Sequence, residues 1–185
     1  MMKKILNRKF YFLVLLFFGS VSPTILQGQN CLNSVYDLES NFLGKRIVDF
    51  EFYKNCYSIK ILDIEDEENS NIKFKQYKFY KGAFISFILE TNWENNDLIE
   101  RIIVFDRDLK YSGNVFVGQF FEYFKENVKN VFWDESFGTF YVYVSDNDSV
   151  AIELTVTNES DLLKWESDIN YIPKETKVKS MIIMK

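Results

Sequence analysis

The segment 72–106 constrains the fold more than any other part of the chain. Three runs rich in apolar and β-branched residues follow one another there, separated by Lys81-Gly82 and Asn95-Asn96. Glycine and asparagine tolerate the positive φ angles that two-residue hairpin turns require. The segment therefore predicts a meander of three antiparallel strands with its corners at these two dipeptides.

The two corners also predict which residues face each other. The expected pairs across Asn95-Asn96 are Trp93 with Leu98, Glu90 with Arg101, Leu89 with Ile102 and Phe87 with Val104, and those across Lys81-Gly82 are Phe74 with Leu89 and Lys73 with Glu90. One face would be apolar, and the other would carry an exposed charge row of Lys73, Glu90 and Arg101 that holds the register. Because Gln76 would lie on the apolar face and Phe79 on the other, we expect a bulge or a second packed layer near them.

The first 28 residues have the pattern of a secretory signal peptide. Basic residues from Lys3 to Lys9 precede a nine-residue apolar run, 10–18, and small residues follow it. Such a run is too short to span a bilayer. We expect cleavage after Gly28, with cleavage after Thr24 and an uncleaved anchor over 10–26 as alternatives. The expected organisation is a signal peptide, 1–28, followed by one domain, 29–185, with no stable membrane span, in a protein exported to the periplasm or beyond.

Removal of the signal peptide makes the chain strongly acidic. The first 28 residues hold four basic and no acidic side chains, so 18 basic and 27 acidic residues remain, a net charge of −9. Nucleic-acid binding is disfavoured, because its affinity comes largely from neutralising phosphates. The expected partner is another protein or a component of the cell envelope.

The only two cysteines, Cys31 and Cys56, both follow the signal peptide. An isolated pair in an oxidising compartment most simply forms one disulfide. Closing a loop of this length would stabilise the fold by about 3.5 kcal/mol in the chain-entropy model.

Periodicity predicts the remaining elements. The expected helices are a short one over 32–43 ended by Gly44, a second over 119–129 and a third over 160–170, and the further expected strands are 46–53, 57–64, 131–134, 139–145, 150–156 and an edge strand over 177–184. The predicted fold class is α+β, a mainly antiparallel sheet of about eight to nine strands with two or three short helices packed on one face.

Two resemblances accompany this order. Residues 34–64 and 119–146 each run helix, strand, turn, strand, a faint repeat that resembles the tandem layout of small secreted inhibitor and binding proteins of the β-lactamase-inhibitor-protein type. The sequence Phe42-Leu43-Gly44-Lys45 resembles the opening of a lipocalin-type barrel, where Arg46 stands in place of the expected tryptophan. The predicted second helix interrupts the strand run, so the open sheet is favoured over the barrel.

The composition excludes several kinds of chemistry. The chain has no histidine, so Ser-His-Asp and Cys-His catalysis and imidazole zinc sites are excluded, and its seven glycines form no phosphate loop. We predict no catalytic, cofactor or metal site, and an enzyme is disfavoured. Among the aromatic residues, Trp93, Tyr141 and Tyr143 are the predicted binding residues.

The leading hypothesis is an exported acidic binding protein, with an inhibitor or immunity-type role as its most specific version. One alternative is a carboxylate-dependent hydrolase of envelope glycans, since such chemistry needs only two suitably placed acids. The other alternative is a lipocalin-like carrier of a small apolar ligand.

Overall fold

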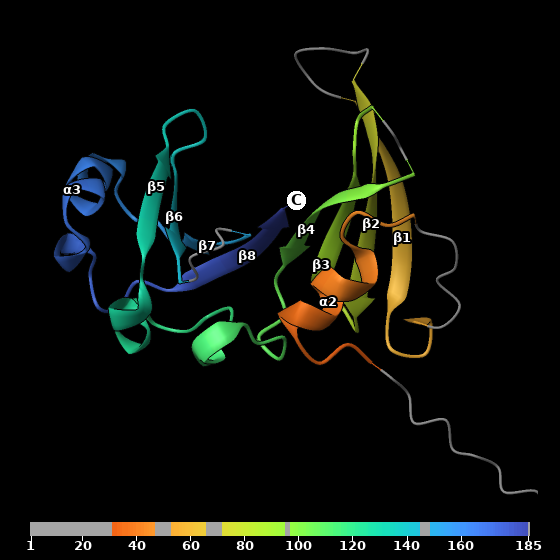
Figure 1. The fold of residues 1–185 in the computed structure, drawn as a ribbon, viewed down its shortest axis with the longest axis horizontal. Coiled ribbons are helices and arrows are strands. Elements are labelled where there is room, and N and C mark those ends of the chain that lie inside the picture. The colour runs from red at the N-terminus through yellow and green to blue at the C-terminus, as the bar shows by residue number, and fades with distance from the viewer. Residues whose placement is uncertain (1–30, 47–52, 66–71, 95–96, 145–148, 185) are drawn as a thin grey trace, which may run out of the picture. The chain divides into compact units, whose positions relative to one another are not determined.

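The strands of the chain form one antiparallel sheet. The computed structural model describes residues 31–46, 53–65, 72–94, 97–144 and 149–184. Within them, eight strands follow the order β1-β2-β3-β4-β8-β7-β6-β5, and every neighbouring pair is antiparallel (Figure 1). The strands are β1 (Ser58–Glu65), β2 (Lys73–Lys81), β3 (Phe84–Thr91), β4 (Ile99–Val104), β5 (Asn130–Asp134), β6 (Thr139–Tyr143), β7 (Val150–Leu154) and β8 (Val178–Met184).

Two α-helices and several 3₁₀ turns complete the described residues. The helices are α2 (Val35–Phe42) and α3 (Leu162–Ser167), and the 3₁₀ turns are η2 (Ser112–Asn114), η3 (Phe121–Tyr123), η4 (Lys125–Asn127), η5 (Glu159–Asp161) and η6 (Ile169–Tyr171). The protein is therefore mostly antiparallel sheet with few helices, and broadly α+β, as the sequence predicts. The predicted corner at 95–96 and most of the predicted strand 46–53 lie outside the described residues.

The first helix, α2, is present where the sequence predicts one, but it begins three residues later and ends one residue earlier than the predicted range 32–43. The Oγ of Ser34 accepts a hydrogen bond from the backbone N–H of Asp37, which satisfies one of the free donors of the first turn. The chain leaves the helix after Phe42, and Gly44 adopts a φ of 70° that favours glycine. The buried side chains of α2 belong to the same core cluster as the strands.

The core is rich in aromatic contacts. The rings of Phe79 and Phe87, on neighbouring strands, stack with centroids 4.3 Å apart, and Phe42 of α2 lies 6.1 Å from Phe79. In the second half of the chain, Trp165 of α3 meets Phe140 of β6 edge to face at 5.6 Å. The core residues that the sequence singles out, namely Phe87, Leu89, Ile102 and Phe124, are all buried.

The β3–β4 register is the predicted one from Phe87 to Glu90. Beyond Glu90 it shifts by one residue, so that Thr91 faces Ile99 and the predicted pair of Trp93 with Leu98 is not formed. Phe87 faces Val104, Leu89 faces Ile102 and Glu90 faces Arg101. The charge row, however, is not an exposed one at Glu90, whose side chain is only 5% exposed. Its carboxylate pairs with the Arg101 guanidinium and accepts a 2.6 Å hydrogen bond from Gln76. The pair therefore compensates a buried charge.

The predicted β2–β3 register is wrong by three residues. The turn is Gly82-Ala83, with a bulge at Phe79/Tyr80, so Tyr77 faces Leu89 and Gln76 faces Glu90 in place of Phe74 and Lys73. This shift removes the conflict in the predicted pattern, since Phe79 is now fully buried and Gln76 is on the polar side. The displaced turn accounts for two residues of the shift. The bulge accounts for the third, because it adds one unpaired residue to β3.

The predicted helix over 119–129 is also wrong. The chain forms two 3₁₀ turns there, η3 and η4, separated at Phe124 by a non-helical φ of −131°. Phe121 and Phe124 are both buried, because residues three apart lie on one side of a 3₁₀ turn as well as of an α-helix. The backbone N–H of Phe121 donates to the carbonyl of Thr176 at 2.7 Å, so this donor is bound to another segment. The third predicted helix is present as α3, between η5 and η6.

The C-terminal strand lies inside the sheet, and its prediction as an edge strand is wrong. β8 pairs with β4 on one side and with β7 on the other (Figure 1). The lysine within it, Lys179, sits at a bulge and pairs with the nearly buried carboxylate of Glu153 at 2.7 Å. The lysine therefore compensates a buried charge and does not protect an edge.

The two halves of the sheet repeat the same arrangement. β1-β2-β3-β4 and β5-β6-β7-β8 are both antiparallel meanders, and β4 pairs with β8 where they meet. In each meander the third strand carries a buried glutamate, Glu90 or Glu153, directly before a bulge. A cation on the fourth strand binds that glutamate: Arg101 of β4 in the first meander and Lys179 of β8 in the second.

A glycine turn before each meander repeats the same backbone hydrogen bonds. The N–H of Gly44 donates to the carbonyl of Ile99 at 2.7 Å, and the N–H of Gly118 donates to that of Val178 at 2.8 Å. Ile99 and Val178 donate back to the residue after each glycine, at 3.1 and 2.9 Å. Both glycines have positive φ, 70° and 87°. The second copy therefore begins before residue 118, and not at residue 119 as the predicted repeat had it.

The position of β8 predicts how two neighbouring isoleucines differ. Ile183 is fully buried in the core, whereas Ile182 lies on the other face and is half-buried. We expect Ile183→Ala to lower the free energy of unfolding by about 3 kcal/mol and Ile182→Ala by about 1 kcal/mol. Urea unfolding measures both, and equal losses would contradict this placement of β8.

The buried glutamate of the first meander generates a second prediction. Arg101→Gln leaves the Glu90 carboxylate without its cation, so we expect the free energy of unfolding to fall by about 2 kcal/mol. Adding Glu90→Gln should recover most of this loss, because no buried charge then remains. Lys73→Gln is the matched control. Because Lys73 pairs with Glu65 in full contact with water, its replacement should leave the free energy of unfolding almost unchanged. A double variant no more stable than Arg101→Gln alone would argue against a compensated charge.

Candidate functional site

A cleft opens beside the turn between β2 and β3. It has a volume of about 800 Å³, within the usual range for small-molecule sites. Its lining residues are Lys81, Ala83, Phe84, Ile85, Ser86, Phe105, Asp106, Arg107, Val117 and Gly118. The cleft therefore lies between the β2–β3 hairpin, the end of β4 and the glycine turn at Gly118 that precedes the second meander.

The walls of the cleft carry exposed aromatic rings. Gly82 adopts a φ of 65° in the two-residue turn, and Phe84 follows at the start of β3 with 80% of its surface exposed. Phe105, directly after β4, is 37% exposed. A large aromatic residue at a hairpin turn is outside the core, so its position is not explained by packing.

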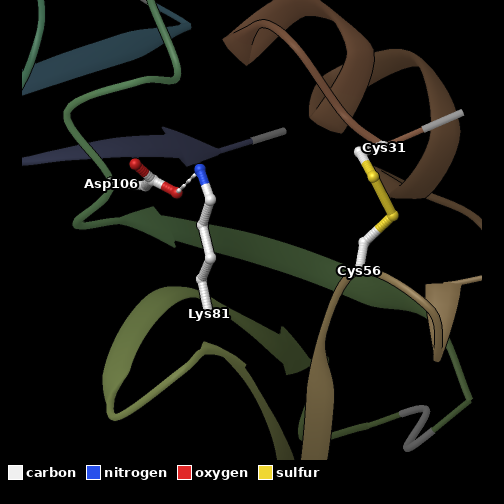
Figure 2. Close-up of a disulfide and its surroundings, with 4 residues drawn as sticks. All are labelled: Cys31, Cys56, Lys81 and Asp106. Carbon is white, nitrogen blue, oxygen red and sulfur yellow. Dashed lines mark ion pairs between the residues drawn. A yellow bond between two sulfur atoms is a disulfide. The ribbon is translucent and has the colours of Figure 1, made fainter. Parts of the chain in front are cut away.

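The floor of the cleft is polar and well ordered. Ser86 Oγ donates to Asp106 Oδ2 at 2.8 Å, and the backbone N–H of Asp108 donates to Asp106 Oδ1 at 2.9 Å. Lys81 Nζ lies 2.7 Å from Asp108 Oδ2 and 3.7 Å from Asp106 Oδ2, and Figure 2 shows its side chain reaching toward Asp106. The hydrogen bond with Asp108 raises the pKa of Lys81. The buried Asp106 carboxylate is thus held by a hydroxyl, a backbone amide and a cation.

Tyr57 lies behind this floor. It is 5% exposed and its ring meets Phe87 edge to face at 5.3 Å. Burial raises the pKa of Tyr57, and the Asp106 carboxylate raises it further, while Lys81 and a hydrogen bond with Ser86 act in the opposite direction. The raised pKa keeps the Tyr57 phenol protonated near the Asp106 carboxylate, which is the acidic side chain that lines the cleft.

The predicted disulfide is present. Cys31 and Cys56 are joined with their Cα atoms 5.8 Å apart, and the bond ties the segment before α2 to the segment before β1 (Figure 2). Such a bond is consistent with an oxidising compartment outside the cytosol. It does not line the cleft.

The structure does not bring the predicted binding residues together. Trp93 is 54% exposed and follows β3 in the first meander. Tyr141 and Tyr143 are half-buried on β6, where Tyr141 stacks on Phe132 at 6.4 Å and accepts a hydrogen bond from Thr139. None of the three lines the cleft.

Sequence reasoning missed Phe84 and Phe105 as site residues. The usable signal was the pattern Lys-Gly-Ala-Phe, in which a phenylalanine follows a tight turn directly, at a position where polar residues are usual. The contribution of the second glycine turn, at Gly118, has no local sequence signal. It depends on the pairing of β8.

The described residues contain no group of three or more His, Cys, Asp or Glu side chains placed to hold a metal ion. No helix among them is both long and apolar enough to cross a membrane. The two buried glutamates, Glu90 and Glu153, are each bound by a cation and a second polar side chain.

Comparison with known proteins identifies a fold and no function. No protein-family model and no curated protein matches the chain. Among solved structures, the chain is similar to the crystal structure of the uncharacterized protein yfeY from Escherichia coli, with a TM-score of 0.53 and 14% sequence identity over 78% of this chain and 96% of that chain. At this identity the likeness is one of fold alone.

The environment of Tyr57 predicts its titration. The folded protein holds the phenolic proton more tightly than the unfolded chain, so this contribution to stability is complete below about pH 10 and is lost as the pH rises through the folded-state pKa. Absorbance titration near 295 nm of the protein and of Tyr57→Phe gives the curve of this one tyrosine by difference. We expect its midpoint above the ordinary value of 10.0. A midpoint at or below that value would contradict the buried, anion-flanked site.

Proposed function

We propose that this chain is an exported binding protein that holds its partner at the cleft beside the β2–β3 turn. The observation that carries the proposal is the exposed pair Phe84 and Phe105 above the ordered polar floor of Ser86 and Asp106. Exposed aromatic residues on a rigid hairpin lose little conformational entropy on binding and contribute large contact areas. The partner would be another protein or a component of the envelope.

Export and acidity support this proposal. The N-terminal 28 residues match a signal peptide, and the Cys31–Cys56 bond fits an oxidising compartment. The net charge of −9 after cleavage favours a basic partner through complementary potentials. An inhibitor or immunity-type role is the most specific version, in which the acidic surface covers a basic site. In this arrangement the helices would pack on one face of the sheet and leave the other face and the cleft accessible.

The hydrolase of envelope glycans is the alternative from another class. It needs two carboxyl groups free to exchange protons at a set separation. Glu90 and Glu153 are each bound by a cation, and Asp106 is bound by two hydrogen-bond donors and lies in an ion pair with Lys81. These contacts favour a binding role over a hydrolytic one. Turnover of a glycan substrate that is lost in a single Asp or Glu to Ala variant would reverse this preference.

The proposal predicts the effect of one substitution at the cleft wall. The exported protein with its disulfide intact is immobilised, and its own envelope extract is passed over it at low and high salt. We expect a dominant retained component that Phe84→Ser loses, because the substitution removes the main apolar contact. For a basic protein partner, we also expect release at high salt.

Phe137→Ser is the matched control. Phe137 is 79% exposed beside Gly138 in another tight turn, and it does not line the cleft. The control should retain the same component as the unaltered protein. Equal retention by Phe84→Ser and the unaltered protein would contradict the cleft as the binding site, and a basic protein partner whose binding is insensitive to salt would exclude the inhibitor version.

A further inference from the structure

The chemistry of the cleft narrows the kind of ligand that it would bind. Apolar side chains form its walls, mainly Phe84, Phe105, Ile85 and Val117. The two phenylalanines remain in contact with water, so a hydrocarbon group placed between them would remove apolar surface on both sides. The volume of about 800 Å³ leaves room for a chain of many carbon atoms and not only for one partner side chain.

The charged groups at the cleft are not equivalent. Asp106 has a side chain that is 10% exposed, and Ser86, the Asp108 amide and Lys81 already surround its carboxylate. Lys81 is paired with Asp108 at 2.7 Å. A ligand therefore meets a carboxylate that already accepts two hydrogen bonds and lies near a cation, and a lysine that is paired with Asp108.

Arg107 is the charged group that is left for a ligand. It is exposed, lines the cleft, and makes no ion pair with any residue that the structure describes. A guanidinium presents paired donors that match a carboxylate or a phosphate. A cationic head group would meet Arg107 and Lys81 as like charges, while the two nearby carboxylates already have partners, Asp106 in Ser86, the Asp108 amide and Lys81, and Asp108 in Lys81. The combination selects an anionic head group next to an apolar body.

We propose that the cleft binds an anionic amphiphile, with its hydrocarbon part between Phe84 and Phe105 and its carboxylate or phosphate on Arg107. This inference rests on the envelope-component version of the proposed function, because it specifies the component that the cleft would hold. It is an alternative to the basic-protein version, since the cleft lining itself carries the two cations Lys81 and Arg107. Two kinds of molecule combine an anionic head group with a hydrocarbon chain, namely free fatty acids and anionic phospholipids. Two arms of one experiment separate them.

In the first arm, the exported protein is titrated calorimetrically with sodium dodecanoate below its micelle concentration. Dodecanol and dodecyltrimethylammonium carry the same chain with a neutral and a cationic head. We expect saturable one-to-one binding of dodecanoate, about tenfold tighter than that of dodecyltrimethylammonium, with dodecanol between them. In the second arm, the protein is mixed with phosphatidylglycerol vesicles, and binding is measured by the share of protein that floats with them.

Four variants locate the site. Phe84→Ser should weaken dodecanoate about tenfold or more, because a ring that covers the chain is lost. Arg107→Gln should weaken dodecanoate about fivefold to tenfold and change dodecanol by less than about twofold. Phe137→Ser and Lys110→Gln remove an exposed phenylalanine and an exposed lysine outside the cleft lining, and should change neither affinity.

The outcomes are distinct. If dodecanoate binds and Arg107→Gln weakens this binding, the ligand is a free fatty acid. If dodecanoate does not bind but the protein floats with phosphatidylglycerol vesicles and Arg107→Gln does not, the ligand is a phospholipid head group. Absence of saturable binding in both arms, equal affinity for the anionic and cationic amphiphiles, or binding unaffected by Phe84→Ser would overturn the inference. If an envelope partner is still lost in Phe84→Ser while no amphiphile binds, the cleft remains the binding site and only its ligand class is wrong.

Discussion

The pairing of β8 with both β4 and β7 is the interaction on which the rest of the structure depends. β8 is the last strand in the chain, yet it joins the two meanders into one sheet. It also accepts the hydrogen bond of Gly118 at Val178, which fixes the second glycine turn beside the end of β4. That turn supplies Val117 to the cleft. The site is therefore completed by long-range strand pairing, although half of its lining residues belong to the β2–β3 hairpin.

Each meander compensates the charge of one buried glutamate with a cation from its fourth strand. A glutamate at the third strand is buried, and a bulge next to it accompanies a cation from the fourth strand. A bulge re-aims side chains locally, so it allows a long cationic side chain to reach a carboxylate on the neighbouring strand. Repetition of this device, together with the two glycine turns, indicates that the two halves are copies of one supersecondary unit whose sequences share few identities.

The sequence could predict the parts of this fold that local patterns determine. The β3–β4 pairing followed from Asn95-Asn96 and alternating apolar residues, and α2 followed from its stripe and Gly44. The β2–β3 register was missed by three residues: two because the turn is Gly82-Ala83 and not Lys81-Gly82, and one because of the bulge at Phe79/Tyr80, which the pattern indicated without giving its exact position. The apolar spacing over 119–129 fits 3₁₀ turns as well as a helix, so spacing alone does not separate the two.

The candidate site was less predictable than the fold. The disulfide followed from cysteine count and compartment. Trp93, Tyr141 and Tyr143 were chosen for their residue type, and the structure places them away from the cleft. The β3–β4 pairing brings Phe84 and Arg107 to the same cleft, and the Gly118 turn joins them only through its pairing with β8.

Hydrogen–deuterium exchange of the protein with and without its own envelope extract tests the central claim most directly. If the cleft is the binding surface, the backbone amides of 81–86 and 105–107 should gain protection together, with little change in β5 and β6. Protection confined to 130–143, on the strands that carry Phe132 and Tyr141, would instead place the binding surface on the sheet and contradict this account.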